Sequence, residues 1–224
     1  MEVKITEQNN NTTIATVDEA LFRNTLTMLL LQKRTHHSAY QYALTREGEI
    51  DLRGADLNGY TLRRIDLRGA NLAGVDVKYA DLSSADLRGA NLEKADMRHA
   101  NLTRASLAEA NLKFAWLPDA KLHEAALTSA VCYKTKLWRA HLIGANLSHT
   151  DFTCADFADA DLTCADLSHA KLNNACLRGT TLNGAQLAYA TFDGTIVDGA
   201  TFDNTTQRGI HTGPFARQVP VTEL

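Results

Sequence analysis

The residues of this chain that could carry chemistry are spread evenly and form no recognisable catalytic set. Asp and Asn fill 16 of 31 equivalent positions in a five-residue pattern. Any pair of carboxylates therefore follows from the pattern and does not indicate a general acid and base. No Ser/His/Asp or Cys/His set can be distinguished from this background. We therefore expect no enzyme activity and no catalytic residues.

Cysteine and histidine also fail to form a metal-binding pattern. The four cysteines fall at three phases of the five-residue pattern and include no CxxC pair, so we expect neither a disulfide framework nor a zinc site. His149 and His169 are separated by four repeats and are expected to stack as an exposed polar ladder. We expect no metal and no cofactor. The four thiols are Cys132, Cys154, Cys164 and Cys176.

The candidate site lies where the pattern lapses. In six successive repeats the position normally held by Asp or Asn holds another residue. Aromatic and basic residues gather in the same region, at positions that we expect to face outward. The six departures are Trp116, Lys121, Ala126, Val131, Lys136 and His141.

Both tryptophans of the chain belong to this region. A coil made of four repeats places Trp116 under Lys136 and Pro118 under Trp138. Trp and Arg are common binding hot spots, and a contiguous exposed apolar patch is costly, so we predict a partner-binding surface. The alternative, which the sequence leaves open, is that Lys stems cover the rings and satisfy the surface internally. The predicted site residues are Lys113, Phe114, Trp116, Tyr133, Lys134, Lys136, Trp138 and Arg139.

These residues must be positioned by a repeat that runs from Ile50 to about Asn204. Leu occupies 23 of the 31 central positions between Leu52 and Phe202, and Ala lies two residues before the centre in 23 repeats. The Ala and Leu side chains share a face because strand side chains alternate. Ten of the 13 glycines occupy the second of the two remaining residues, where a type II turn needs positive φ. The repeat therefore predicts short strands joined by tight turns.

Four strand-and-turn units, one from each repeat, close into a square coil. Strands of successive coils should pair about 4.8 Å apart, so about 155 residues make about 7.75 coils and a rod roughly 37 Å long. We therefore predict an all-β solenoid for residues 50–204.

The motif Ala-Asp/Asn-Leu-x-x appears as Ala55-Asp56-Leu57, Ala70-Asn71-Leu72 and Ala165-Asp166-Leu167, among other copies. In this motif the chain resembles the pentapeptide repeat family. The resemblance covers most of the chain, from Ile50 to Asn204, and implies a right-handed quadrilateral β-helix. The family is widespread in bacteria, notably cyanobacteria, where one member acts in heterocyst control. A regulatory role is compatible with that resemblance.

The two ends of the chain lie outside the repeat. Thr16-Val17-Asp18-Glu19 and Ser38-Ala39-Tyr40-Gln41 have the form of capping boxes, which predict helices at about 17–33 and 39–46 within an N-terminal segment, 1–49. These helices would cover the first coil. Before them, the alternating Val3 and Ile5 predict a short edge strand or a frayed tail. Residues 205–224 are predicted to form an irregular tail, and a homodimer could form through a solenoid end.

The charge and the lack of a long apolar segment exclude some classes of function. A formal net charge of -3 and a pI of about 6.2 exclude a strongly basic nucleic-acid coat. The segment Met1–Thr16 shows no signal-peptide pattern, and the apolar run Met28–Leu31 is too short to span a bilayer. We therefore expect a cytoplasmic protein without membrane contacts.

Our preferred hypothesis is a non-enzymatic scaffold or regulatory protein that binds an unidentified protein partner through the aromatic and basic patch. The first alternative is a DNA mimic that protects or inhibits DNA gyrase. It needs an acidic rod, whereas residues 50–139 hold 14 Lys/Arg against 11 Asp/Glu, a net +3. The unbroken register also leaves out the protruding loops on which quinolone-resistance members of the family rely for gyrase protection.

A second alternative is nucleic-acid binding through a basic stripe in the N-terminal half of the repeat. Acidic residues interleave with this stripe, so a solvated face is the better expectation. The stripe consists of Arg53, Arg63, Arg64, Arg68, Arg88, Arg98 and Arg104.

Overall fold

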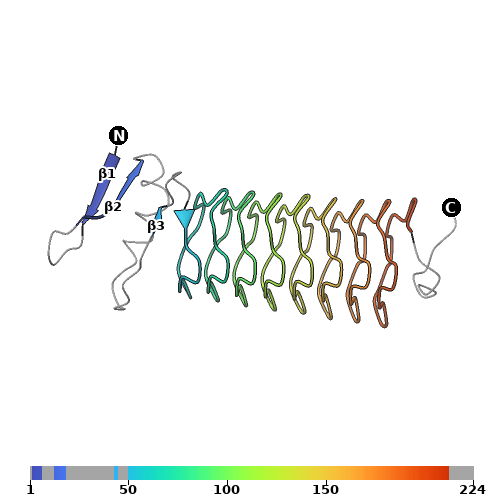
Figure 1. Ribbon diagram of the computed structural model, residues 1–224. Coiled ribbons are helices and arrows are strands. Elements are labelled where there is room, and N and C mark those ends of the chain that lie inside the picture. Colours follow the sequence, from blue (N-terminus) through green and yellow to red (C-terminus); the bar gives the residue numbers. More distant parts are fainter. Residues whose placement is uncertain (1, 7–12, 19–42, 45–49, 212–224) are drawn as a thin grey trace.

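The repeat forms a rod of stacked coils (Figure 1). The computed structural model describes residues 2–6, 13–18, 43–44 and 50–211. Parallel bridges join equivalent residues of successive coils, beginning with Asp56 to Asp76 and ending with Thr191 to His211. The ladder therefore continues past Asn204, where the sequence pattern had placed its end. No helix among the described residues is long and apolar enough to cross a membrane.

Four short strands occur among the described residues at the N-terminal end of the chain. Strand β1 (Glu2–Thr6) pairs antiparallel with β2 (Thr13–Asp18). Strand β3 (Ala43–Leu44) pairs antiparallel with β4 (Ile50–Asp51), which leads into the first coil.

The predicted helix start at Val17 is wrong, because Val17 lies in β2 and pairs with Val3 of β1. The run from Thr13 to Val17 is rich in β-branched residues, which favour a strand. Residues 19–33 of that helix lie outside the described residues. The second predicted helix, 39–46, is also wrong at residues 43–44, which form β3, and its other residues lie outside the described ranges.

Backbone hydrogen bonds between coils hold the rod together. The amide of Leu57 donates to the carbonyl of Asp76 at 2.7 Å, and the amide of Asp76 donates back to Ala55 at 2.9 Å. A third bond joins the turn amide of Gly59 to Lys78 at 2.8 Å. The same three bonds recur along the rod, so three of the five amides in each repeat find acceptors in a neighbouring coil.

The two other amides of a repeat are satisfied locally. The Tyr60 amide donates to the Leu57 carbonyl at 3.2 Å and closes the turn. The Asn58 amide, between them, donates to the Asp56 carboxylate at 3.1 Å. A hydrogen bond from a backbone amide to the side chain two residues earlier forms an Asx turn, which Asp and Asn favour. The polar residue of the repeat therefore supplies the one acceptor that the backbone cannot.

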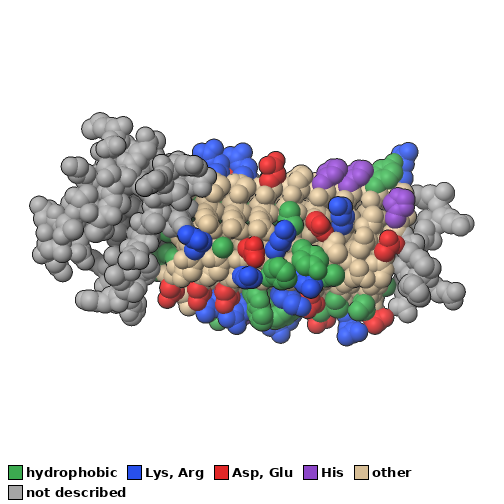
Figure 2. All heavy atoms as spheres, in the orientation of Figure 1, with side chains coloured by type: hydrophobic (Ala, Val, Ile, Leu, Met, Phe, Trp, Pro, Cys, Tyr) green, Lys and Arg blue, Asp and Glu red, His purple; other side chains and the backbone are tan. Residues whose placement is uncertain are grey.

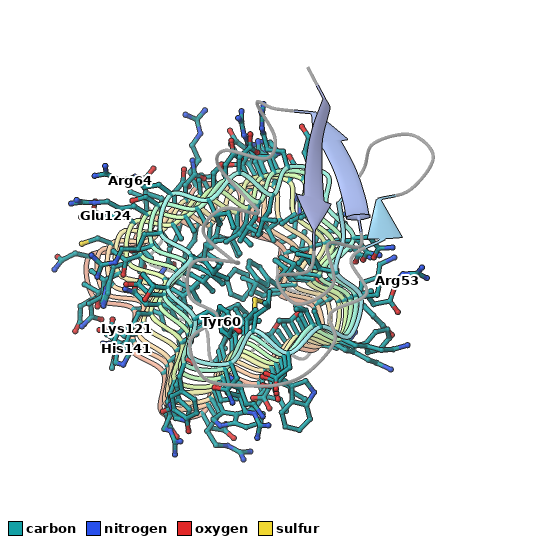
Figure 3. The ribbon with its side chains drawn as sticks, turned by 90° about the vertical axis from the view of Figure 1, so that its left-hand side faces the viewer. Arg53, Tyr60, Arg64, Lys121, Glu124 and His141 are labelled. Carbon is teal, nitrogen blue, oxygen red and sulfur yellow. The ribbon has the colours of Figure 1, made fainter. Side chains whose placement is uncertain are left out.

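The centre of the rod is packed with the central residue of each repeat and the small residue two before it. Leu and Ala at these positions are almost fully buried along the rod, and Phe152 and Phe157 pack edge to face at 4.9 Å. Thr replaces Ala at a few buried positions, where its hydroxyl donates to a carbonyl of the coil below, as from Thr150 to Leu127 at 2.7 Å. Outward side chains overlie one another in columns, such as Lys121 with His141 (Figure 3).

The third residue of each turn has a positive φ, as the glycine positions predicted. The angle is +65° at Gly89, and residues with side chains adopt it too, including Lys94 at +57°. Such a conformation costs an L-residue about 1–2 kcal/mol. Repeats without glycine at this position therefore accept a local strain that the inter-coil ladder outweighs.

Gly89→Ala tests this strain without a steric complication, because nothing lies within 4 Å of a Cβ placed on Gly89. We expect the free energy of unfolding to fall by about 1 kcal/mol, because only the backbone conformation becomes less favourable. Chemical denaturation measures it. A matched control is Lys94→Gly, which should be neutral or stabilising; a loss of stability there would contradict the argument.

Candidate functional site

The Asp or Asn side chain that accepts from the turn amide is missing in the middle of the rod, and it is missing again after Asp166. Before the lapse, Asn111 accepts from the amide of Lys113 at 3.2 Å. After it, Asn146 accepts from Ser148 and Asp151 from Thr153, at 3.1 and 3.0 Å. Between them, a set of turn amides has no acceptor among the residues that the structure describes. These amides belong to His123, Thr128, Tyr133, Trp138 and Ile143.

Trp116 is the first of the six departures, but it leaves no turn amide without an acceptor. The residue that would need its acceptor is Pro118, which has no amide hydrogen. Pro118 is buried, although its position was expected to face outward. The proline therefore removes the donor at the point where tryptophan removes the acceptor.

The predicted aromatic residues meet in two pairs. Trp116 and Trp138 pack edge to face with ring centroids 5.7 Å apart. Phe114 and Tyr133 do the same, also at 5.7 Å. Trp116 is 45% exposed and Phe114 38% exposed, whereas their partners are half-buried. Figure 2 shows a group of hydrophobic side chains bordered by Lys and Arg near the middle of the visible face.

The predicted cations divide into two kinds. Arg139 donates to both carboxylate oxygens of Asp119 at 2.8 and 2.7 Å, and the Lys136 ammonium lies 3.4 Å from Asp156. Lys134 lies over the Tyr133 ring, 5.2 Å from its centroid. Neither Lys134 nor Lys113 forms an ion pair within the described part of the chain. We call the eight predicted residues the aromatic and basic patch.

Two further residues belong to this surface, although the sequence analysis did not select them. The guanidinium of Arg98 lies over the Trp116 ring at 5.8 Å and is also bonded to Asp96. Asp119 lies between Arg139 and His99, whose Nδ1 is 3.9 Å from it. Arg139 donates to this carboxylate and lowers the pKa of Asp119. A comparison of columns in successive coils could have found Asp119, which lies under Arg139, whereas Arg98 reaches Trp116 from a neighbouring column.

Some charges and rings of the patch thus already contact other residues of this chain. This finding bears on the alternative that the surface is satisfied internally. Arg98 and Lys134 each lie over a ring, and Arg139 and Lys136 have counterions. Phe114 has no cation over its ring, and Lys113 has no counterion, among the described residues, while Trp116 remains 45% exposed beside Arg98. The uncovered groups are the ones available to a partner.

The basic stripe is largely neutralised by carboxylates. Arg68 and Arg88 bond Asp66 and Asp86 at 2.7 and 2.6 Å, and in each pair the arginine lowers the pKa of the aspartate. Arg63, Arg98 and Arg104 are similarly held by Asp81, Asp96 and Glu124. An ion-paired, solvated face is therefore the better description, as the interleaved charges predicted.

The histidine ladder and the cysteines offer no metal site in the described ranges. His149 and His169 stack at 4.6 Å with an interplanar angle of 4°, and Tyr189 continues the stack. Imidazoles stacked face to face cannot both direct a lone pair at one ion about 2.1 Å away. No group of three potential ligands occurs among the described residues. All four thiols are free, and burial raises the pKa of Cys132.

Comparison with known proteins gives a family match over most of the repeat. The family described as pentapeptide repeats (8 copies) matches overlapping windows that together extend over residues 50–204. No curated protein sequence matches the chain. The individual windows are 50–89, 85–123, 105–142, 130–168, 140–179 and 165–204.

Solved structures of similar proteins include HetL, a pentapeptide repeat protein involved in heterocyst differentiation regulation from the cyanobacterium Nostoc sp. strain PCC 7120. It is 31% identical, the match covers 71% of this chain and 79% of HetL, and the TM-score is 0.48. QnrB1, a plasmid-mediated fluoroquinolone resistance protein, is 14% identical over 70% of this chain and 85% of its own, with a TM-score of 0.39. Rfr23 from the cyanobacterium Cyanothece 51142 is 24% identical over 59% and 67%, with a TM-score of 0.23.

The aspartates bound by arginine predict how stability depends on pH. The pKa of Asp119 is lowered in the folded state by its hydrogen bonds to Arg139, so the unfolded chain binds protons more readily. This stabilisation is present above the ordinary Asp pKa of about 3.9 and is lost as the pH falls through the folded-state value. We expect the fall in melting temperature between about pH 5 and pH 3 to be smaller in Asp119→Asn than in the wild type.

Thermal denaturation followed by circular dichroism at a series of pH values measures this difference. The matched control is Asp193→Asn, which removes an exposed carboxylate that makes no ion pair within the described residues. An Asp119→Asn protein with the same acid sensitivity as the wild type would contradict the assignment.

Proposed function

The chain belongs to the pentapeptide repeat family, and we propose that it is a non-enzymatic scaffold that binds a protein partner through the aromatic and basic patch. The observation that carries this proposal is the exposure of Trp116 and Phe114 beside cations that have no counterion among the described residues. Singly exposed rings are common, but a contiguous group of exposed aromatic side chains is typical of an interaction site. The patch also lies where the repeat departs from its own pattern.

The residue types of the patch fit a protein interface. Trp, Tyr and Arg are enriched among the residues that contribute most to binding, and they act best when surrounding contacts exclude water. Trp116 and Trp138 provide an apolar centre, and Lys113 and Lys134 provide charge at its border. An apolar centre with a charged rim is the usual arrangement of a non-obligate interface.

We propose a regulatory role in the cytoplasm, with a right-handed winding of the rod as in the family. The support is the 31% identity to HetL, which is involved in heterocyst differentiation regulation. A rigid rod suits such a role because the inter-coil ladder fixes the patch without any conformational change. A scaffold of this kind presents a surface and does no chemistry.

Gyrase protection is the second candidate, since QnrB1, one of the similar solved structures, is a fluoroquinolone resistance protein. DNA mimicry needs runs of uncompensated negative charge. Here the aspartates of the N-terminal half are bound to cations, as Asp66 is to Arg68 and Asp86 to Arg88. The arginines of these pairs are likewise bound to carboxylates, which weighs against the third candidate, nucleic-acid binding.

The double substitution Trp116→Ala and Trp138→Ala tests the proposed function. Both rings lie on the outside of the rod, so the variant should fold with a melting temperature within a few degrees of the wild type. Affinity capture from a lysate of the source organism should lose the partner that the wild type retains. Tyr189→Ala is the matched control, because it removes an exposed aromatic ring outside the patch. Retention of the partner by the folded double variant would overturn the proposal.

A supercoiling assay with DNA gyrase separates the first two candidates. With a quinolone present, we expect this protein to leave inhibition of supercoiling unchanged over a concentration range up to a large excess over gyrase. The reason is that the acidic side chains of its N-terminal half are held by cations. Restored supercoiling activity would place the protein with the gyrase-protecting members of the family instead.

A further inference from the structure

The orphan turn amides of the patch indicate the chemistry of the partner. We propose that the partner presents an acidic, extended peptide segment, whose carboxylates accept hydrogen bonds from the amides of Tyr133 and Trp138. This inference rests on the proposed function and specifies its partner. The carboxylates would take the place of the Asp or Asn side chains that the rod lacks at Val131 and Lys136.

The direction of these amides follows from their neighbours in the same column. Directly below Tyr133, the amide of Lys113 donates outward to the side chain of Asn111 at 3.2 Å. Directly above it, the amide of Thr153 donates to Asp151 at 3.0 Å. The ladder holds the Tyr133 turn in the same geometry, so its amide points at the outer position where Val131 supplies methyl groups instead of an oxygen.

Trp138 stands in the same situation at the other side of the patch. The amide of Ala158, one coil above, donates to Asp156 at 3.3 Å. At Trp138 the equivalent side chain is Lys136, which can only donate. The apolar centre of the patch is therefore flanked by two outward-pointing donors that have no acceptor in the described structure. A ligand that covers this surface excludes water from these amides, so a ligand that supplies an acceptor is favoured over one that leaves them unsatisfied.

The charge around these amides selects an anion over a neutral acceptor. Lys113 lies in the same column as Tyr133, and Lys134 follows Tyr133 directly. Neither ammonium has a carboxylate partner in the described part of the chain. A carboxylate bonded to the Tyr133 amide would lie near both cations, and charge-assisted hydrogen bonds of this kind are about twice as strong as neutral ones.

The rings favour a peptide over a single-stranded nucleic acid. Proteins that bind single strands present open aromatic faces on which bases stack. Here the rings are packed edge to face within each pair, and Arg98 already covers one face of Trp116. Hydrophobic and basic side chains lie side by side on this face (Figure 2). Such a surface suits an extended peptide that alternates acidic and apolar residues.

The first experiment measures binding of a short fluorescein-labelled peptide that alternates Asp and Leu. Its comparison peptide has Asn in place of every Asp. Fluorescence anisotropy at about 50 mM salt should give binding that is at least about tenfold tighter for the acidic peptide, and the difference should shrink as salt rises. Absence of binding at about 1 mM acidic peptide, or equal affinity for both peptides, would overturn the inference.

The decisive variant is Val131→Asn, which restores the missing acceptor without adding charge. Asn already performs this role in the same column at Asn91 and Asn111. The variant should therefore fold at least as stably as the wild type, yet bind the acidic peptide about tenfold more weakly, because the Tyr133 amide is already bonded. Undiminished affinity in the folded variant would show that the amide takes no part.

Ala126→Asn is the matched control. It restores an acceptor within the same lapse, for the amide of Thr128, but on the side of the square coil opposite Trp116 and Lys136. Its stability should rise as in Val131→Asn, while its affinity for the peptide should equal that of the wild type. A comparable loss of affinity would show that Val131→Asn acts through the coil as a whole, and would overturn the inference.

The failure of this inference can be told apart from failure of the proposed function. If the double tryptophan variant loses its captured partner and Val131→Asn retains it, the patch binds a protein but the acidic segment is wrong. A labelled oligothymidylate that binds the patch more tightly than the acidic peptide would overturn both, because the partner would then be a nucleic acid.

Discussion

The hydrogen-bond requirement of five amides in five residues determines most of this structure. Three amides are satisfied by adjacent coils and one by the turn carbonyl, as in the repeat of Leu57. The fifth has no backbone acceptor within reach, and a short polar side chain supplies one, as Asp56 does for Asn58. Asp and Asn suit this role, and they fill the position in 16 of the 31 repeats. A repeat that looks rich in functional carboxylates is thus using them as structure.

This constraint explains why the fold could be predicted from the sequence and why some details could not. Leu at the centre and Ala two residues before it repeat so regularly that one coil predicts all the others, and the column positions of Trp116 and Lys136 follow by counting. Contacts between columns do not follow from counting, as the diagonal pairing of Trp116 with Trp138 and the guanidinium of Arg98 over Trp116 show. Those contacts depend on side-chain rotamers chosen by mutual packing.

The N-terminal error has a different physical origin. Residues Thr16 to Glu19 have the local pattern of a helix start. A local pattern carries no information about which distant segment pairs with these residues. Val3 and Val17 are brought together in the antiparallel pair of β1 and β2, and pairing between distant segments outweighed the capping signal. In the rod no such competition arises, because each repeat between the first and last coils pairs in the same geometry with the coil above and the coil below.

The loss of a structural aspartate has two effects at once, and both bear on recognition. Elsewhere in the rod the same aspartate caps the turn amide and neutralises the cation two residues on, as Asp86 does for both the amide and the guanidinium of Arg88. Without it, the turn loses its acceptor and nearby cations lose a counterion. Tyr133 and Trp138 then present bare donors beside uncompensated lysines, on a surface that also exposes aromatic rings. In our proposal, a single kind of change, sustained over several pentapeptides, converts an architectural face of the rod into one that attracts an acidic partner.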